Sequence, residues 1–168
     1  MGNYDQHIQR GHPILFGLLL FFALIEGCIT AWLVASYNNN DSYPSPSIRD
    51  RLKFLVFVSW WTVFFSAVYI ASFFMAAMSV IASTASHAVF LILTWIFWLA
   101  GIASFTSAIG GTLHCGAQHA LVYCSQLSAA EAFGWMSFIV VTVMLVFILL
   151  LGGVALRGGQ RLSDGLVA

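Results

Sequence analysis

One acidic residue, Glu26, lies inside a long apolar run of this sequence. An ionised carboxylate is costly in hydrocarbon, so acids at such positions usually mark a buried partner or an ion pathway. Three interpretations stay open. Glu26 is a protonated carboxyl hydrogen-bonded to Ser, Thr or Trp of a neighbouring helix, a proton-coupled transport site, or a contact between protomers.

Two cysteines, Cys115 and Cys124, lie in one uncharged segment. A disulfide between them would close a short ring and stiffen this segment in an oxidising compartment. The alternative is a zinc site that adds His114 and His119, although the Cys-x-x-Cys spacing of compact zinc modules is missing. The third cysteine, Cys28, lies within an apolar run, and we expect it to be a small buried residue.

Ser128 and Glu131 have the spacing of a capping box. In this motif the serine oxygen accepts a hydrogen bond from an unpaired backbone amide, and the glutamate reaches back to the cap. The spacing predicts that the last helix begins near Ala129. A carboxylate at the positive end of a helix dipole is stabilising, so we interpret Glu131 as structural rather than catalytic.

Sequence signatures of catalysis are missing. The apolar runs carry no pair of histidines that could ligate haem, and the chain has no Cys-x-x-Cys, glycine-rich phosphate loop or serine elbow. We therefore expect a protein that is not an enzyme and that has no cofactor or catalytic metal. The formal net charge is zero, and the few basic residues lie beside the apolar runs, which argues against nucleic acid as a partner.

Long apolar runs must position these residues, and they cover residues 13–37, 54–82, 88–110 and 132–156. The chain is 61% hydrophobic and 7% charged, with a mean hydropathy of +0.94. A soluble domain of this composition would expose large apolar patches. Each run reaches the roughly 20 residues that a helix needs to cross a bilayer. The sequence predicts an all-α integral membrane protein, a four-helix transmembrane bundle forming a single domain over residues 1–168.

The connections between these spans are predicted at residues 38–53, 83–87 and 111–131. The second is so short that the spans it joins must pack side by side. Charge does not orient the bundle, because each side carries three basic residues. Two weaker signals, the glycosylation sequon at Asn40 and the cysteine pair, favour an outside position for the first and third connections.

The third span repeats small residues at helical spacing, with Ala100, Ser104 and Ala108 on one ridge. Such a ridge lets the backbone of another helix approach closely. We expect it to make contacts inside the bundle, and a contact between protomers of a homo-oligomer is the alternative.

Three stretches of the chain resemble the MARVEL-domain family, and its fungal members in particular: Ser47 to Phe57, Thr94 to Gly111 and Cys124 to Phe133. The resemblance implies cytoplasmic termini and loops on the extracellular or luminal face. It also implies a non-enzymatic role in organising the plasma membrane or the endomembrane system, through lipid microdomains, vesicle trafficking or membrane apposition. Membrane lipids and other membrane proteins would then be the partners.

Two further patterns bear on partners. Residues 51–56 fit a loose inverted sterol-contact pattern, which makes sterol a candidate lipid. Small multidrug transporters also place one glutamate in the first of four spans with aromatic residues nearby, as Glu26, Trp32, Trp60 and Trp61 do here. A small proton-coupled transporter that uses Glu26 is therefore the alternative function.

Overall fold

Four long helices form the part of the chain that the structure describes. The computed structural model describes residues 2–75, 84–111, 113, 115 and 122–157. The helices are α1 (Gly2–Asn40), α2 (Pro46–Met75), α3 (Thr84–Ile109) and α4 (Cys124–Arg157). Each contains a segment of 24 to 27 residues that is long and apolar enough to cross a membrane. The predicted all-helical transmembrane bundle is confirmed.

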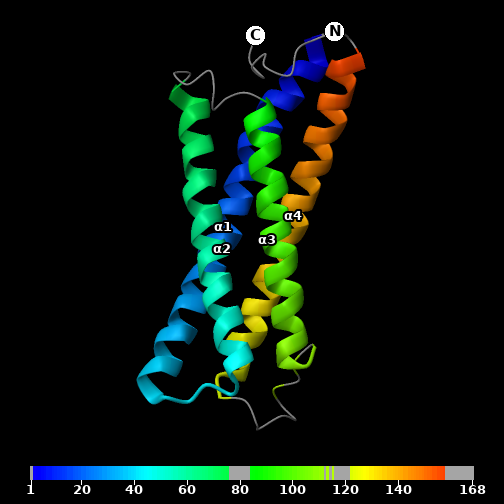
Figure 1. Cartoon of the computed structure of the whole chain (residues 1–168). Helices are drawn as coiled ribbons and strands as arrows, with labels where there is room; N and C mark the ends of the chain where they lie inside the picture. The colour runs from blue at the N-terminus through cyan, green and yellow to red at the C-terminus, as the bar shows by residue number, and fades with distance from the viewer. Residues whose placement is uncertain (1, 76–83, 112, 114, 116–121, 158–168) are drawn as a thin grey trace.

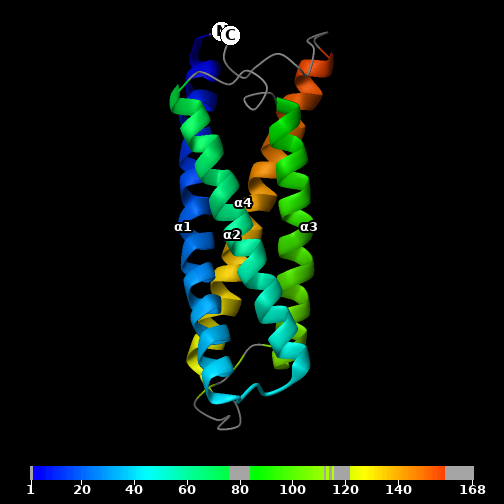
Figure 2. The same cartoon turned by 60° about the vertical axis from the view of Figure 1, so that its left-hand side comes forward.

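The helices form a ring in which each one packs on two others (Figures 1 and 2). α1 packs on α2 and α4, and α3 packs on the same two helices. Across the diagonal, the ring of Phe16 on α1 lies 5.8 Å from that of His87 and 6.5 Å from that of Phe90, both on α3. α1 begins and α4 ends at one end of the bundle, which we call the terminal end. The connections that follow α1 and α3 lie at the other end, which we call the loop end (Figure 1).

The buried face of α1 alternates steps of three and four residues. Its members are Phe16, Leu19, Ala23, Glu26, Thr30, Leu33 and Tyr37. This heptad spacing keeps one seam of a helix against its neighbours along the whole bundle. Glu26 and Thr30 therefore occupy interior positions that apolar residues would ordinarily fill.

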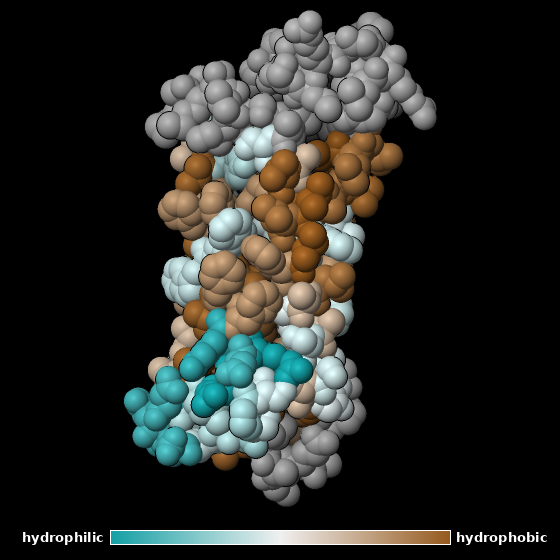
Figure 3. Space-filling model, in the orientation of Figure 1, coloured by the Kyte–Doolittle hydropathy of each residue, from teal (hydrophilic) through white to brown (hydrophobic). Residues whose placement is uncertain are grey.

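On the face of the bundle shown in Figure 3, apolar residues predominate among the described residues, and hydrophilic residues gather near the loop end. Large apolar side chains from all four helices are exposed, among them Ile14, Phe21, Trp32, Phe57, Phe64, Ile96, Phe147 and Leu150. In water such a surface would promote aggregation, whereas in a bilayer it contacts lipid tails. The protein is an integral, multi-pass membrane protein.

α2 and α3 begin earlier than the apolar runs predict. α2 starts at Pro46, so residues 46–53, with the charged residues 49–53, are helical and do not belong to the predicted connection 38–53. α1 continues to Asn40, which removes residues 38–40 from the same connection. Ser45 caps α2, because its Oγ accepts from the amide of Ile48 at 3.2 Å, and proline suits the first helical position. α3 starts at Thr84, which corrects residues 84–87 of the second predicted connection; residue 83 lies outside the described residues.

α4 begins at Cys124 rather than near Ala129. The amides of Gln126 and Leu127 already bond to the carbonyl of Tyr123, at 3.1 and 3.0 Å. Ser128 and Glu131 therefore lie inside the helix, and the predicted cap is wrong. The physical reason is burial: Leu127 and Ala130 extend the interior apolar face of α4 toward the loop end.

α3 approaches both neighbours closely at glycines. A Cβ added at Gly134 of α4 would lie 2.5 Å from Cδ1 of Ile102. A Cβ added at Gly101 of α3 would lie 3.1 Å from Cδ2 of Leu55 on α2. These two glycines bring α3 close to α2 and α4.

The glycine contact between α3 and α4 predicts a stability difference between two variants. Gly134→Leu should lower the free energy of unfolding by about 1–3 kcal/mol, because the new side chain overpacks against Ile102. Gly17→Leu is the control, since a Cβ there would meet no atom within 4 Å. Unfolding of both purified variants in detergent measures the effect, and equal losses would contradict the packing described here.

Candidate functional site

Indole hydrogen bonds tie α3 to both of its neighbours. In the described residues, each bond runs from a tryptophan Nε1–H to a threonine Oγ1: Trp61 to Thr94 at 3.2 Å, Trp98 to Thr62 at 3.1 Å, Trp95 to Thr142 at 3.0 Å and Trp135 to Thr106 at 3.1 Å. The bonds are reciprocal, because α3 donates once and accepts once at each interface. This arrangement fixes the register of α3 against α2 and α4.

The threonine hydroxyls that accept these indole bonds also need an acceptor for their own O–H groups. Thr62 donates to the carbonyl of Val58, and Thr142 donates to the carbonyl of Phe138, both at 2.8 Å. Each of these hydroxyls thus accepts one bond and donates another, as a bilayer interior requires. These bonds are not predicted from the sequence. Threonines within apolar spans that also contain tryptophan are the signal that could have found them.

Glu26 is fully buried, at 0% exposure, and faces the interior of the bundle. Neither carboxyl oxygen has a hydrogen-bond partner among the residues that the structure describes. Thr30 donates to the backbone carbonyl of Glu26 at 2.7 Å, so its hydroxyl does not bond to the carboxyl group. The direct bond to Ser, Thr or Trp of a neighbouring helix is not made, and burial removes Glu26 from any surface between protomers.

Buried serine hydroxyls share this unpartnered state. Ser59 and Ser66 of α2 and Ser137 of α4 are fully buried, and their Oγ atoms have no partner within the described residues. Ser59 is placed beside α1, because a Cβ added at Gly27 would lie 3.2 Å from its Cβ. We call Glu26, Ser59, Ser66 and Ser137 the buried polar seam.

A second carboxyl group, Glu131, also lies inside a span, because α4 begins earlier than the sequence predicts. Two ring contacts fix the register of α4 against α1: Phe22 lies 6.2 Å from Phe133 of α4, and Trp32 lies 5.1 Å from Tyr123, the residue before α4. Between these contacts, Glu26 and Glu131 stand within about one helical turn of the same height. Glu131 lies one turn before Trp135, on the side of α4 that faces α3. Glu26 and Glu131 therefore lie at different helix interfaces.

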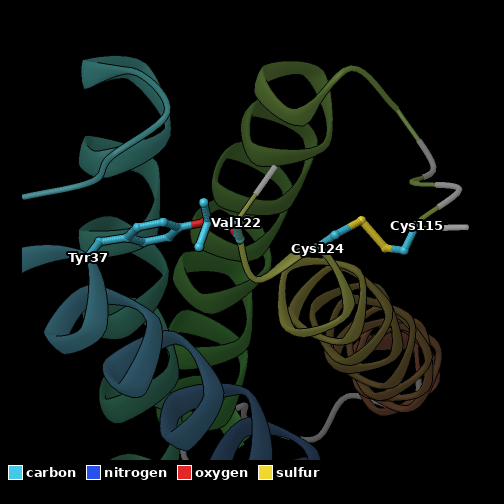
Figure 4. The surroundings of a disulfide bond; sticks show 4 residues. All are labelled: Tyr37, Cys115, Val122 and Cys124. Atoms are coloured by element: carbon cyan, nitrogen blue, oxygen red, sulfur yellow. Dashed lines mark hydrogen bonds between the residues drawn. A yellow bond between two sulfur atoms is a disulfide. The ribbon is translucent and has the colours of Figure 1, made fainter. Parts of the chain in front are cut away.

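The loop end is closed by a disulfide and a hydrogen bond (Figure 4). Cys115 and Cys124 are joined by an S–S bond of 2.00 Å. Tyr37 donates from its phenol to the carbonyl of Val122 at 2.6 Å, which ties the end of α1 to the residues before α4. His114 and His119, the other ligands of the alternative zinc site, lie outside the described residues. Within the described residues no cluster of three or more potential metal ligands is found.

Tyrosines surround this closure. The ring of Tyr37 lies 5.0 Å from that of Tyr43 and 5.4 Å from that of Tyr123. The Tyr43 phenol donates to either of two acceptors, the carbonyl of Val34 at 3.2 Å or Oδ1 of Asn38 at 3.1 Å. Burial raises the pKa of the Tyr43 phenol and the Arg49 guanidinium lowers it, with a net increase, so the hydroxyl keeps its donor at physiological pH.

The asparagine of the predicted glycosylation sequon takes part in the same cluster. Nδ2 of Asn40 donates to the carbonyl of Ser36 at 2.9 Å and to the phenol oxygen of Tyr123 at 3.2 Å. A glycan on Nδ2 would remove one of these two donors. Asn40 is exposed, and its bond to Tyr123 links the end of α1 to the residue before α4.

The predicted ridge on α3 lies at the edge of the interior, and Ala108 of its three residues packs against the apolar core. Ala100 is exposed, and Ser104 and Ala108 are half-buried, so the expected contact inside the bundle is wrong for Ala100. The ridge lies beside the interior stripe, because the large residues Trp98, Ile102 and Phe105 take the buried positions. Cys28 is likewise exposed on α1, which corrects its expected burial.

The disulfide predicts a specific thiol count. Protein denatured without reductant should react with a maleimide at one cysteine, Cys28, and after reduction at all three cysteines of the sequence. Mass spectrometry of the labelled protein counts the adducts. Three adducts before reduction, in protein isolated with its thiols blocked, would show that Cys115 and Cys124 are free.

Comparison with known protein families matches residues 10–147 to MARVEL, described as a membrane-associating domain. The match covers most of the chain and reaches from α1 into α4. No curated protein and no solved structure matches the sequence.

Proposed function

Because the chain belongs to the MARVEL family of membrane-associating domains, we propose that it organises membrane without catalysing a reaction. The observation that carries this proposal is the contrast between its two surfaces. The interior is filled by large buried side chains and by the indole ties, whereas large apolar residues of all four helices face outward. The lipid-facing surface would then carry out the function. The proposed roles are formation of lipid microdomains, vesicle trafficking or membrane apposition.

The proposed mechanism is preferential solvation by particular lipids. α2 presents a row of exposed aromatic side chains, Phe57, Trp60 and Phe64, at helical spacing. Rigid rings pack differently against ordered and disordered acyl chains, so this row biases which lipids surround the protein. Sterol is one candidate, since Arg51, Phe54 and Val56 of the sterol-contact pattern are each partly accessible from outside.

This mechanism predicts a lipid preference that depends on α2. In giant vesicles with coexisting ordered and disordered phases, the labelled protein should partition unequally between the two. Replacing Phe57 and Phe64 together by Ala should change the partition ratio at least about twofold, or about 0.4 kcal/mol. Phe147→Ala on α4 is the control, because it removes an equally exposed ring outside the row. Equal partitioning of the unmodified protein would contradict the mechanism.

We also propose that both termini face the cytoplasm and that the loop end is extracellular or luminal, in the plasma membrane or the endomembrane system. The disulfide at the loop end supports this orientation, since disulfides persist in oxidising compartments. The cytoplasmic ends of α1 and α4 then lie together at the terminal end.

Lys53, the one lysine of the sequence, provides a test of this orientation, because it is exposed near the loop end. In sealed microsomes a membrane-impermeant amine reagent should label Lys53 only after the vesicles are permeabilised. Lys53→Arg identifies the signal by removing it. Labelling of Lys53 in intact microsomes would place the loop end in the cytoplasm.

We further propose that the protein self-associates through α3. Ala100, Ala103 and Ser107 are small and exposed, so the backbone of α3 is approachable from outside. Ala103→Leu should lower the yield of cross-linked dimer in membranes severalfold. Ala67→Leu, a matched change at an exposed alanine of α2, should not. Equal yields from both variants would contradict a contact through α3.

Proton-coupled transport is the second candidate function. The observation that favours it is the fully buried carboxyl of Glu26, which has no hydrogen-bond partner among the described residues. The two candidates differ in one measurable property, because a transporter moves protons across the membrane together with a substrate and a membrane organiser does not.

A further inference from the structure

The carboxyl group of Glu26 lies near the middle of its span, which covers Ile14–Asn40. It faces α2 and α4, the two helices on which α1 packs. Ionisable residues of the described part of α2 lie toward its ends, with Arg49, Asp50, Arg51 and Lys53 at the loop end and Tyr69 toward the terminal end. α4 contributes Glu131 and, at its last residue, Arg157. α3 contributes His87, which lies beside Tyr69 toward the terminal end, with 4.3 Å between the two rings. None of these is a cation in the middle of the bundle, so we find nothing among the described residues that would neutralise a Glu26 carboxylate.

A neutral carboxyl avoids the cost of a buried charge, but it still has one O–H donor and acceptor oxygens to satisfy. Buried polar groups without any hydrogen bond are rare, because each costs about 1–3 kcal/mol. The ordinary solution, a bond to a neighbouring hydroxyl or indole, is already committed elsewhere. Thr30 bonds to the backbone carbonyl of Glu26, and the indoles of Trp61, Trp95, Trp98 and Trp135 bond to threonines at the interfaces of α3. The indole of Trp60 approaches α1 at Gly27, where a Cβ would lie 3.6 Å from its Nε1, but the Trp60 side chain is exposed on the outer surface of the bundle.

Ser59 supplies the nearby polar group that is not committed. Its hydroxyl is fully buried and has no partner within the described residues. It stands against Gly27, the residue that follows Glu26, where α1 and α2 approach each other closely. A water molecule needs two to four polar partners to be held in a protein interior, and the Glu26 carboxyl and the Ser59 hydroxyl together offer that many.

We propose that Glu26 and Ser59 form a hydrated proton-binding site in the middle of the bundle. Glu26 carries the proton, and water bridges its carboxyl group to the Ser59 hydroxyl. The ligands of this site are a proton and water. The site goes beyond the membrane-organising function and does not depend on it, because a hydrated neutral carboxyl requires no transport.

Infrared spectroscopy of the full chain in lipid tests this site through the carbonyl stretch of the protonated carboxyl. The spectrum of the unmodified protein minus that of Glu26→Gln should contain this band. The band should shift to lower wavenumber in D₂O, because the bridging water lets the carboxyl proton exchange for deuterium. In Ser59→Ala it should move to higher wavenumber, because the carboxyl loses part of its hydrogen bonding.

Ser66→Ala is the matched control. Ser66 lies on the same buried face of α2, about two turns from Ser59, and its hydroxyl is also unpartnered among the described residues. This variant should leave the band in place. If Glu26→Gln does not fold, protein carrying ¹³C-carboxyl glutamate in a Glu131→Gln background identifies the Glu26 band without changing Glu26.

The outcomes separate clearly. A Glu26 band that shifts in D₂O and responds to Ser59→Ala but not to Ser66→Ala supports the hydrated site. A Glu26 band that is insensitive to D₂O and to Ser59→Ala shows a dry carboxyl and overturns the proposal. Absence of a protonated-carboxyl band for Glu26 shows an ionised group and also overturns it. None of these outcomes depends on lipid partitioning, so the membrane-organising proposal stands or fails separately.

Discussion

A bilayer interior provides no water to hydrogen-bond with polar side chains, and this constraint shapes the whole structure. Helices satisfy their own backbone, so the problem falls on the threonines, serines, tryptophans and the carboxyl groups that the spans carry. The reciprocal indole-to-threonine bonds satisfy such groups on α3, because each bond joins an indole N–H to a threonine hydroxyl on the facing helix. The same bonds fix how far α3 slides along α2 and α4. Packing at Gly101 and Gly134 then brings the helices to the separation that these bonds require.

The class of fold was predictable, because long apolar segments with few charges leave little choice but transmembrane helices. The positions of the helix starts were not. The charged residues 49–53 were assigned to a connection, although Ser45 and Pro46 carry an N-cap and first-turn signal just before them. The spacing of Ser128 and Glu131 matches a capping box, but the same spacing can also occur inside a helix. The burial of Leu127 and Ala130 shows that here it lies inside the helix.

Which face of each helix points inward was also beyond the sequence. A span that is apolar all round gives a weak periodic signal, so Ala100 and Cys28 were placed inward although both are exposed. The two cysteines of the last connection suggested a disulfide, and the structure joins them. Its role at the loop end depends on Tyr37 and Asn40 of α1, which come from a distant part of the chain and gave no such signal.

In this bundle, hydrogen bonds and close packing hold the helices together in the interior, and the outer surface is apolar. The indole ties hold α3, the disulfide and the tyrosines close the loop end, and large exposed side chains meet the lipid. A protein built in this way suits a role in which its outer surface selects lipids and neighbours while its interior stays fixed. A buried carboxyl near mid-membrane, such as that of Glu26, suits both a membrane organiser and a proton-coupled transporter, so the two differ in whether Glu26 moves protons across the membrane.

Proton flux through the purified protein therefore tests the central claim most directly. Proteoliposomes with a pH-sensitive dye inside would be given a pH gradient and a panel of lipophilic cations, with unmodified protein and with Glu26→Gln. The account predicts the same background flux and uptake for both proteins and for empty liposomes. Flux or cation uptake that requires Glu26 would contradict it and establish the protein as a proton-coupled transporter.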